Sequence, residues 1–303
     1  MRVYLLADIS ITEKAEILIS VFFVYPVILI ITKQKERGLD MCLITFRIAN
    51  HPKYKLILAA NRDEAYARPT EMASFWSEHP QLLAGKDLEA NGTWLGITKD
   101  GRIAAITNCH EGTDKVEQIT YTADSPKKSR GKIITDYLLS KKQPEIYLHE
   151  LIKEKHAYQP FNILLGNADA LYHFNSQEES FVQLHKGTHS ISNASLDTPW
   201  PKVRKTKKQI DRILKGEDHY IESLFEMMMD QIPARDDELQ YAAALPLDLR
   251  RKTSAPFIKT EGFGTRSTTL LLVDYDDQVT FLERTYKKND TSSDQMFHFK
   301  IGE

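Results

Sequence analysis

The order of strand-like and helix-like segments constrains the fold of this 303-residue chain more than any single motif. Short apolar runs come in pairs, and turn signals such as Asp100-Gly101 and Asp276-Asp277 separate them, which predicts antiparallel hairpins. Segments with apolar residues at three- and four-residue spacing, one of them opened by Pro144, predict helices. We expect strands at residues 42–48, 55–61, 92–98, 102–108, 161–167, 170–174, 181–185, 267–274, 278–286 and 296–301, and helices at 129–141, 144–157, 199–214 and 218–232.

Pairs of predicted strands therefore alternate with pairs of predicted helices along the chain, whereas single strands do not alternate with single helices. This order favours antiparallel sheets with helices packed outside them in layers. Two polar segments, 111–130 and 233–266, are expected to be long loops. We predict a single α+β domain over residues 42–303.

Residues 1–41 stand apart from this domain as an apolar extension. The window 17–32 is the most apolar in the chain, but it is shorter than the roughly 20 residues of a spanning helix and it contains Pro26. Acidic residues before it and the lack of a small-residue cleavage site are unusual for a signal peptide. Because codons for residues 36–38 can contain a purine-rich ribosome-binding sequence, we favour an over-extended start with native initiation at Met41. A membrane anchor is the alternative, and only then would the protein contact a membrane.

Composition limits the classes of function. The chain has 40 basic and 42 acidic residues, whereas general nucleic-acid and membrane-surface binders show a basic excess. Its two cysteines, Cys42 and Cys109, form no CxxC pair and indicate a reducing compartment, so we expect a cytoplasmic protein. No histidine spacing is typical of a zinc site, and no metal is expected. The basic residues of one predicted helix are expected to form a solvated face: Lys202, Arg204, Lys205, Lys207 and Lys208.

Polar groups gather where predicted strands end. The stretch 61–64, NRDE, follows the purely apolar ILAA and is either a solvated turn or the lip of a site. An arginine beside an aspartate at such a lip can hold a thiolate, orient an amine and bind an anionic group. Asn108 is either a strand cap or an oxyanion donor. Arg266, in a glycine-rich turn, is either structural or an anion clamp.

Seven stretches in this order resemble one family: MCLITFR, LILAANRDE with Arg68-Pro69 after it, GTWLGI, AAITN, FNILLGN, SNASLDTPWPK and GFGTRSTTLLLV. It is the NRDE-motif family, whose eukaryotic members are called transport and Golgi organization protein 2. The resemblance runs from Met41 to about Tyr286 and implies an N-terminal nucleophile hydrolase fold, a four-layer α-β-β-α sandwich. Chains of the family begin Met-Cys, which supports initiation at Met41, and residues 1–40 have no counterpart.

The resemblance also implies a mechanism. Removal of Met41 would give Cys42 a free α-amine, whose unperturbed pKa near 8 lies close to that of a thiol, near 8.5. The amine can then be the base for its own side chain. By similarity to bile-salt and penicillin V amidases, Arg62 and Asp63 would steady the thiolate and the amine. The predicted catalytic set is Cys42, Arg62, Asp63, Asn108, Asn193 and Arg266, with Asn61 and Trp94 as substrate-binding residues.

Two functions follow from this resemblance. The first is a cysteine amidohydrolase that acts on a small-molecule amide or acyl substrate and requires no cofactor. The second is a non-catalytic carrier of haem or an acyl lipid on the same scaffold, because the family is associated with haem trafficking, lipid homeostasis and Golgi organisation. Cys42, His110 and the later histidines would be the axial ligands of a bound haem. No nucleic-acid partner is expected.

Overall fold

The computed structural model describes residues 41–109, 127–216, 220–239, 246–287 and 291–303. The chain divides into two compact units, Met1–Asp40 and Met41–Glu303, and every described residue belongs to the second. The apolar window 17–32 and His110 lie outside the described residues. None of the helices in the described part of the chain has the length and apolar character needed to span a membrane.

Six strands form the first sheet, with every neighbouring pair antiparallel. Their spatial order is β10 (Gly187–Ile191), β1 (Leu43–Ile48), β2 (Tyr54–Ala65), β11 (Phe263–Asp274), β12 (Gln278–Tyr286) and β13 (Ser292–Lys300). The predicted β1–β2 and β11–β12 hairpins are confirmed, and the turn of the second includes Asp277 with a φ of 63°. The sheet thus joins strands from both ends of the described unit.

Seven strands form the second sheet, in which chain order and spatial order are the same. They are β3 (Thr70–Trp76), β4 (His79–Asp87), β5 (Leu95–Thr98), β6 (Ile103–Asn108), β7 (Phe161–Gly166), β8 (Leu171–Asn175) and β9 (Phe181–Gln183). All neighbours are again antiparallel. The β5–β6 turn has Gly101 at a φ of 83°, which glycine adopts without strain.

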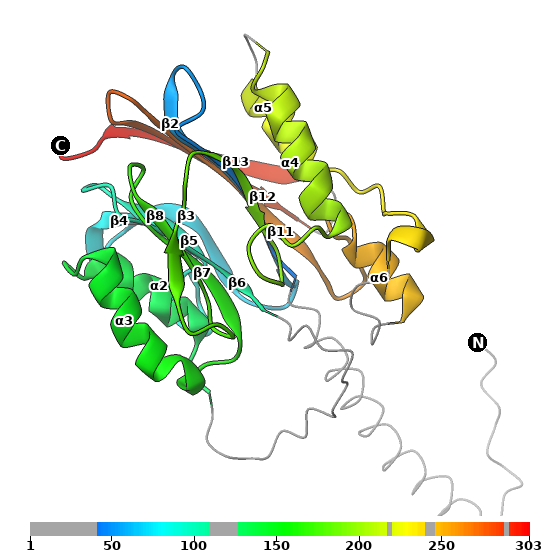
Figure 1. Ribbon diagram of the computed structural model, residues 1–303, viewed down its shortest axis with the longest axis horizontal. Helices are drawn as coiled ribbons and strands as arrows, with labels where there is room; N and C mark the ends of the chain where they lie inside the picture. The colour runs from blue at the N-terminus through cyan, green and yellow to red at the C-terminus, as the bar shows by residue number, and fades with distance from the viewer. Residues whose placement is uncertain (1–40, 110–126, 217–219, 240–245, 288–290) are drawn as a thin grey trace, which may run out of the picture. The chain divides into compact units, whose positions relative to one another are not determined.

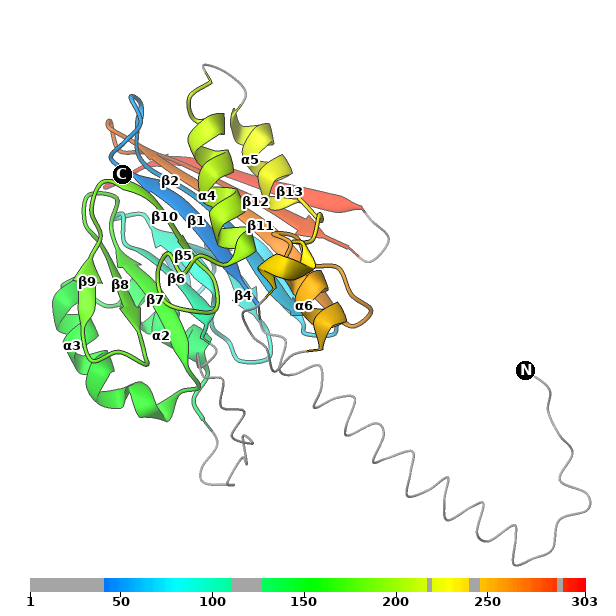
Figure 2. The same cartoon turned by 45° about the vertical axis from the view of Figure 1, so that its right-hand side comes forward.

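Helices cover the outer face of each sheet (Figure 1). The helices are α2 (Arg130–Leu139), α3 (Pro144–Glu154), α4 (Pro201–Ile213), α5 (Tyr220–Met228) and the short α6 (Leu247–Thr253), with 3₁₀ turns η1 (Lys155–Ala157) and η2 (Asp236–Glu238). One apolar core packs α2 and α3 against the second sheet, and another packs α4 and α5 against the first. A third core lies between the sheets and includes Phe46 and Leu271 facing Leu83 and Leu164. The predicted α+β, four-layer α-β-β-α sandwich is therefore confirmed, and Figure 2 shows its layers from a second direction.

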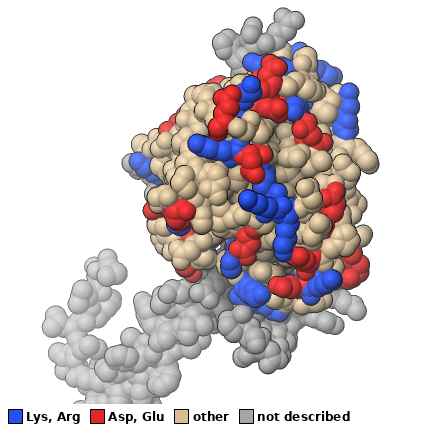
Figure 3. Space-filling view, turned by 90° about the vertical axis from the view of Figure 1, so that its left-hand side faces the viewer, with Lys and Arg blue, Asp and Glu red and all other residues tan. Residues whose placement is uncertain are grey.

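Several elements differ from the sequence prediction. The sequence did not predict strands β3, β4 and β10. The sequence of β10, GTHSI, has no run of apolar residues, and the β3–β4 pair contains register shifts that interrupt the alternation of apolar and polar residues. The prediction of one long loop over 233–266 is wrong, since η2, α6 and the start of β11 lie within it. Most of the other predicted loop, 111–130, lies outside the described residues. On one face of the molecule, basic and acidic side chains are interspersed, in keeping with the nearly balanced composition (Figure 3).

Candidate active site at the start of the first strand

Cys42 directly precedes β1, at an edge where both sheets present polar groups. In the β1–β2 ladder Leu43 pairs with Asn61, so continuing the register by one residue sets Cys42 opposite Arg62. Side chains alternate along a strand. Because Ile44 packs between the sheets and Leu43 packs under the helices, the Cys42 side chain lies on the inter-sheet face. The thiol is partly exposed, and its Sγ atom is 3.9 Å from the backbone oxygen of Asp63.

The NRDE stretch is the end of β2, and strand alternation divides its four side chains between two faces. Asn61 bonds to α5 and Asp63 bonds to β11 on the helix side. Arg62 contacts Thr70 of the second sheet on the opposite side. The side chains of Arg62 and Asp63, the two predicted partners of Cys42, therefore lie on different faces of the sheet.

Arg62 is held tightly on the inter-sheet face. Its guanidinium is 5% exposed and lies 4.2 Å from the centre of the Trp94 ring, within the range of a cation–π contact. It donates to Thr70 Oγ1 at 2.8 Å and has carboxylate oxygens of Glu64 and Asp87 at 3.7 Å. Burial lowers the pKa of Arg62, while the neighbouring acids and Cys42 act in the opposite direction. Trp94, predicted to bind substrate, contacts this arginine.

Asp63 is buried on the helix side, and one of its oxygens is occupied. Thr265 Oγ1 donates to Asp63 Oδ1 at 2.6 Å. A register shift in β11 between Thr265 and Ser267 makes this contact, because the extra residue of a bulge turns the preceding side chains to the other face. Burial raises the pKa of Asp63, and Lys202 and Thr265 oppose that rise.

Lys202 corrects the prediction of a solvated basic face on α4. Its side chain is 0% exposed, whereas Arg204 and Lys208 are exposed. Lys202 lies four residues before Thr206 and eight before Ile210, both of which are buried on the sheet-facing side of the helix. That helical spacing in the sequence is the signal that would have separated Lys202 from its basic neighbours.

The loop after β10 contacts Cys42 from a third direction. Ser192 Oγ donates to the carbonyl oxygen of Cys42 at 2.8 Å. The next residue, Asn193, is fully buried and donates through Nδ2 to the backbone oxygen of Asn108 at 3.0 Å. From the second sheet, Thr107 Oγ1 donates to the backbone oxygen of Ser192 at 2.6 Å. The structure thus brings both predicted asparagines to the edge where Cys42 lies.

Arg266 and Asn61 are committed to the protein itself. Arg266 Nη1 donates to the backbone oxygens of Ala65 and Arg68, at 2.9 and 3.0 Å, and so clamps the turn after β2. The Asn61 amide is 2% exposed and makes three internal hydrogen bonds. We therefore assign Asn61 no place in substrate binding.

Two of the later histidines that were predicted as haem ligands, His173 and His189, contact polar side chains. Among the residues that the structure describes, no group of three His, Cys, Asp or Glu side chains is arranged to hold a metal ion. His173 is buried against the Asn162 amide, and burial lowers its pKa to about 4. His189 is bonded to Asp197, which raises its pKa.

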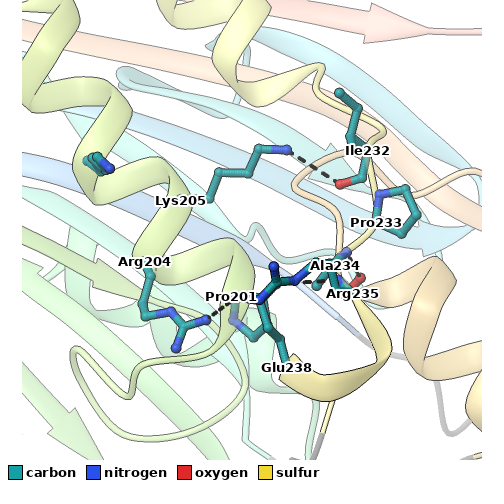
Figure 4. A pocket seen from close by; sticks show the side chains of 10 residues that line it. Pro201, Arg204, Lys205, Ile232, Pro233, Ala234, Arg235 and Glu238 are labelled. Atoms are coloured by element: carbon teal, nitrogen blue, oxygen red, sulfur yellow. Dashed lines mark hydrogen bonds and ion pairs between the residues drawn. The ribbon is translucent and has the colours of Figure 1, made fainter.

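A separate basic cleft of about 340 Å³ lies on the outer side of α4 (Figure 4). Arg204 and Lys205 line it, facing Ile232 and Glu238. Arg204 is paired with Glu238 at 2.6 Å, and Lys205 donates to the Ile232 oxygen at 3.4 Å. None of the predicted site residues lines this cleft.

The family model described as Transport and Golgi organisation 2 matches residues 41–288. The chain belongs to the Transport and Golgi organisation 2 family. The resemblance inferred from the NRDE and neighbouring motifs is thereby confirmed.

Family relatives match over most of their length. The chain is 32% identical to the Transport and Golgi organization protein 2 homolog of Homo sapiens, covering 83% of this chain and 95% of that protein. It is 28% identical to Transport and Golgi organization protein 2 of Drosophila melanogaster, covering 81% and 92%. Among solved structures, an N-acylethanolamine-hydrolyzing acid amidase ortholog of Caenorhabditis elegans matches at 12% identity and a TM-score of 0.42, covering 77% of this chain and 92% of that one.

In this member of the Transport and Golgi organisation 2 family, three residues at the site were not among the predicted ones. Ser192 and Thr265 act through single hydroxyl groups in loops or bulges, for which a sequence carries no periodic signal. Lys202 carried such a signal but was grouped with the surface lysines. All three lie within the matched range.

Proposed function

We propose that this protein is an amidohydrolase whose nucleophile is the Cys42 thiol, once Met41 has been removed. The observation that carries the proposal is the arrangement around Cys42. The partly exposed Cys42 thiol directly precedes β1. The buried Arg62 guanidinium lies on the same face of the sheet as this thiol, and the Asp63 carboxylate lies on the opposite face. This set matches what a chain-terminal cysteine nucleophile requires.

The reaction begins with transfer of the Sγ proton to the α-amine of Cys42. The thiolate then attacks the carbonyl carbon of a linear amide, and the negative charge moves to the carbonyl oxygen. Asn108, whose side chain is partly exposed, is the proposed donor to that oxygen, and the buried Asn193 holds the Asn108 backbone in place. The amine product leaves with a proton from the α-ammonium group, and water hydrolyses the remaining thioester. Arg62 favours the thiolate, and Arg266 keeps the turn after β2 in place.

Two sets of contacts hold the groups around Cys42 in defined positions. The Cys42 carbonyl is held by Ser192, so the backbone on the C-terminal side of the nucleophile is fixed. Arg62 is packed against Trp94 and hydrogen-bonded to Thr70, so its charge is held in a defined place. Groups held in this way lose little freedom when a substrate binds.

Cys42→Ala tests the proposal, with Cys109→Ala as the matched control for loss of a thiol. Intact mass of the protein from its native host establishes whether the chain begins at Cys42. Both variants and the wild type are then assayed with N-acyl amino acids and acyl-CoA, and for haem binding. We expect Cys42→Ala to lose turnover on the order of 10⁴-fold or more, with little change in stability, and Cys109→Ala to retain turnover.

A different set of results would favour the carrier. A wild-type protein that binds haem tightly, cleaves no amide and reacts slowly with iodoacetamide at Cys42 would contradict the hydrolase proposal. Recovery of native protein that still carries residues 1–40 would contradict the chain-terminal nucleophile.

A further inference from the structure

Two opposite charges are buried behind the ends of β1 and β2, on the side that faces α4. Lys202 and Asp63 are both almost completely inaccessible. Neither Lys202 Nζ nor Asp63 Oδ2 has a hydrogen-bond partner within the described part of the chain. Burial of an ionised group without such a partner is strongly unfavourable. Packing alone would therefore favour an apolar side chain at residue 202.

The two charges act on each other and on the nucleophile. Burial lowers the pKa of Lys202, and Asp63 and Cys42 are the two groups that oppose this. Burial raises the pKa of Asp63, and the Lys202 ammonium is the strongest group that opposes it. Lys202 therefore lies within electrostatic reach of both the carboxylate and the thiol.

In the described part of the chain, the titratable groups that interact electrostatically with Cys42 or Asp63 also include Arg62, Glu64 and Tyr66. All three come from β2 or the turn that follows it. From β11 comes the neutral Thr265 hydroxyl, which bonds to Asp63. Among the described residues, Lys202 acts on Asp63 from the helix layer, whereas Arg62 acts on the thiol from the inter-sheet face.

We propose that Lys202 is a positioning residue that keeps the α-amine of Cys42 uncharged by offsetting the negative charge of Asp63. The inference rests on the proposed function, in which that amine is the base. In the proposed function Asp63 steadies the amine, and Asp63 alone would hold it as an ammonium group, which cannot accept a proton. With the Lys202 charge opposite, the pair is neutral overall, and the amine retains its lone pair.

The proton then moves within Cys42 itself, from the thiol to the α-amine. The S–H bond breaks, an N–H bond forms, and a neutral amine and thiol become an ammonium group and a thiolate. Asp63 stabilises the new ammonium charge, and Lys202 stabilises the thiolate. Each charge of the pair thus favours one product of the transfer, without itself gaining or losing a proton.

The test measures iodoacetamide alkylation of Cys42 against pH, which requires no substrate. Variants are made from the complete gene in the native host, and intact mass identifies the fraction that begins at Cys42. Lys202→Met removes the charge at nearly constant length, Asp63→Asn removes the opposite charge, and Lys208→Met is the control on the exposed side of α4. We expect the midpoint of alkylation to rise by about one pH unit in Lys202→Met and to fall in Asp63→Asn, because the two charges act in opposite senses. Lys208→Met should match the wild type.

A double variant, Asp63→Asn with Lys202→Met, carries neither charge and covers the case in which Lys202→Met does not fold. Its midpoint should return toward the wild-type value, above that of Asp63→Asn alone. Folded variants whose midpoints do not move, or all move in the same direction, would overturn the assignment. Opposite shifts without any amide hydrolysis would support Lys202 and reject the proposed function, whereas hydrolysis without shifts would do the reverse.

Discussion

Replacement of Asn61 by alanine should destabilise the protein strongly without touching the nucleophile. The Asn61 amide donates to the backbone oxygens of Met228 and Pro256, at 2.8 and 2.9 Å, and accepts from Thr268 Oγ1 at 2.6 Å. Met228 ends α5, so this amide satisfies one of the carbonyls that a helix leaves unpaired at its C-terminus. Asn61→Ala removes a partner from three buried groups.

The expected loss follows from those three bonds. A neutral hydrogen bond contributes roughly 1 kcal/mol, and a buried group left without its partner costs about 1–3 kcal/mol. Thr268 also accepts a bond from Tyr286, which lowers its share. We expect Asn61→Ala to reduce the free energy of unfolding by about 3–4 kcal/mol, a large part of the about 5–15 kcal/mol that is typical of a folded protein.

Urea unfolding measures this change, with Asn50→Ala as the control at an exposed asparagine. The control should stay within about 0.5 kcal/mol of the wild type. A loss below about 1 kcal/mol in Asn61→Ala with an unchanged m-value would refute the reasoning, because the three bonds would then contribute little. Weakened substrate binding at full stability would restore Asn61 to the substrate-binding role that its motif suggested.

Three further predictions concern residues near the site and in the cores around it. Gly85→Ala should displace the Trp94 ring, because a Cβ atom at residue 85 would overlap its Cη2 atom. We expect a change in tryptophan fluorescence and a loss of about 1–3 kcal/mol in the free energy of unfolding, and unchanged fluorescence and melting would contradict this. Because burial lowers the pKa of His173 from 6.5 to about 4, its stability contribution should be complete above pH 6.5 and fall by about 3 kcal/mol toward pH 4; His173→Gln should flatten that part of a urea-derived stability curve. Asp197→Asn should lose about 1–2 kcal/mol at pH 7 in urea unfolding, since Asp197 bonds to Lys207 at 2.7 Å and its pKa is lowered to about 2; an unchanged midpoint would argue against it.

Much of the fold could be predicted because local pattern and tertiary structure agree. The β1–β2 hairpin, the Asp100-Gly101 turn and the helix opened by Pro144 each carry a periodicity or a turn signal within a few residues. The layer order follows, since antiparallel pairs with one-sided helices have few ways to bury their apolar faces. Strand β3 lacked such a pattern, because its ladder with β4 shifts register twice.

The residue types of the candidate site could be proposed from the sequence, but their geometry could not. Because side chains alternate along a strand, Arg62 and Asp63 point to opposite faces of the first sheet, although the NRDE motif places them side by side in the sequence. Thr265 reaches Asp63 through a register shift, which depends on how β2 and β11 pair across the fold. Lysine is almost never fully buried, so the sequence predicted an exposed side chain at Lys202, whereas the structure buries it.

The position of β1 inside its sheet has a consequence for the order of events during synthesis. Strand β1 lies between β2 and β10, and β2 pairs on its other side with β11. Because β10 ends at Ile191 and β11 begins only at Phe263, the ribosome must release these distant segments before the sheet around β1 and β2 is complete, and such distant pairings form slowly. If translation begins at Met41, β1 can pair early with β2 alone, and its other edge stays unpaired until β10 has been made. An aminopeptidase then has time to trim Met41, and the sheet assembles around a terminus that has already been processed.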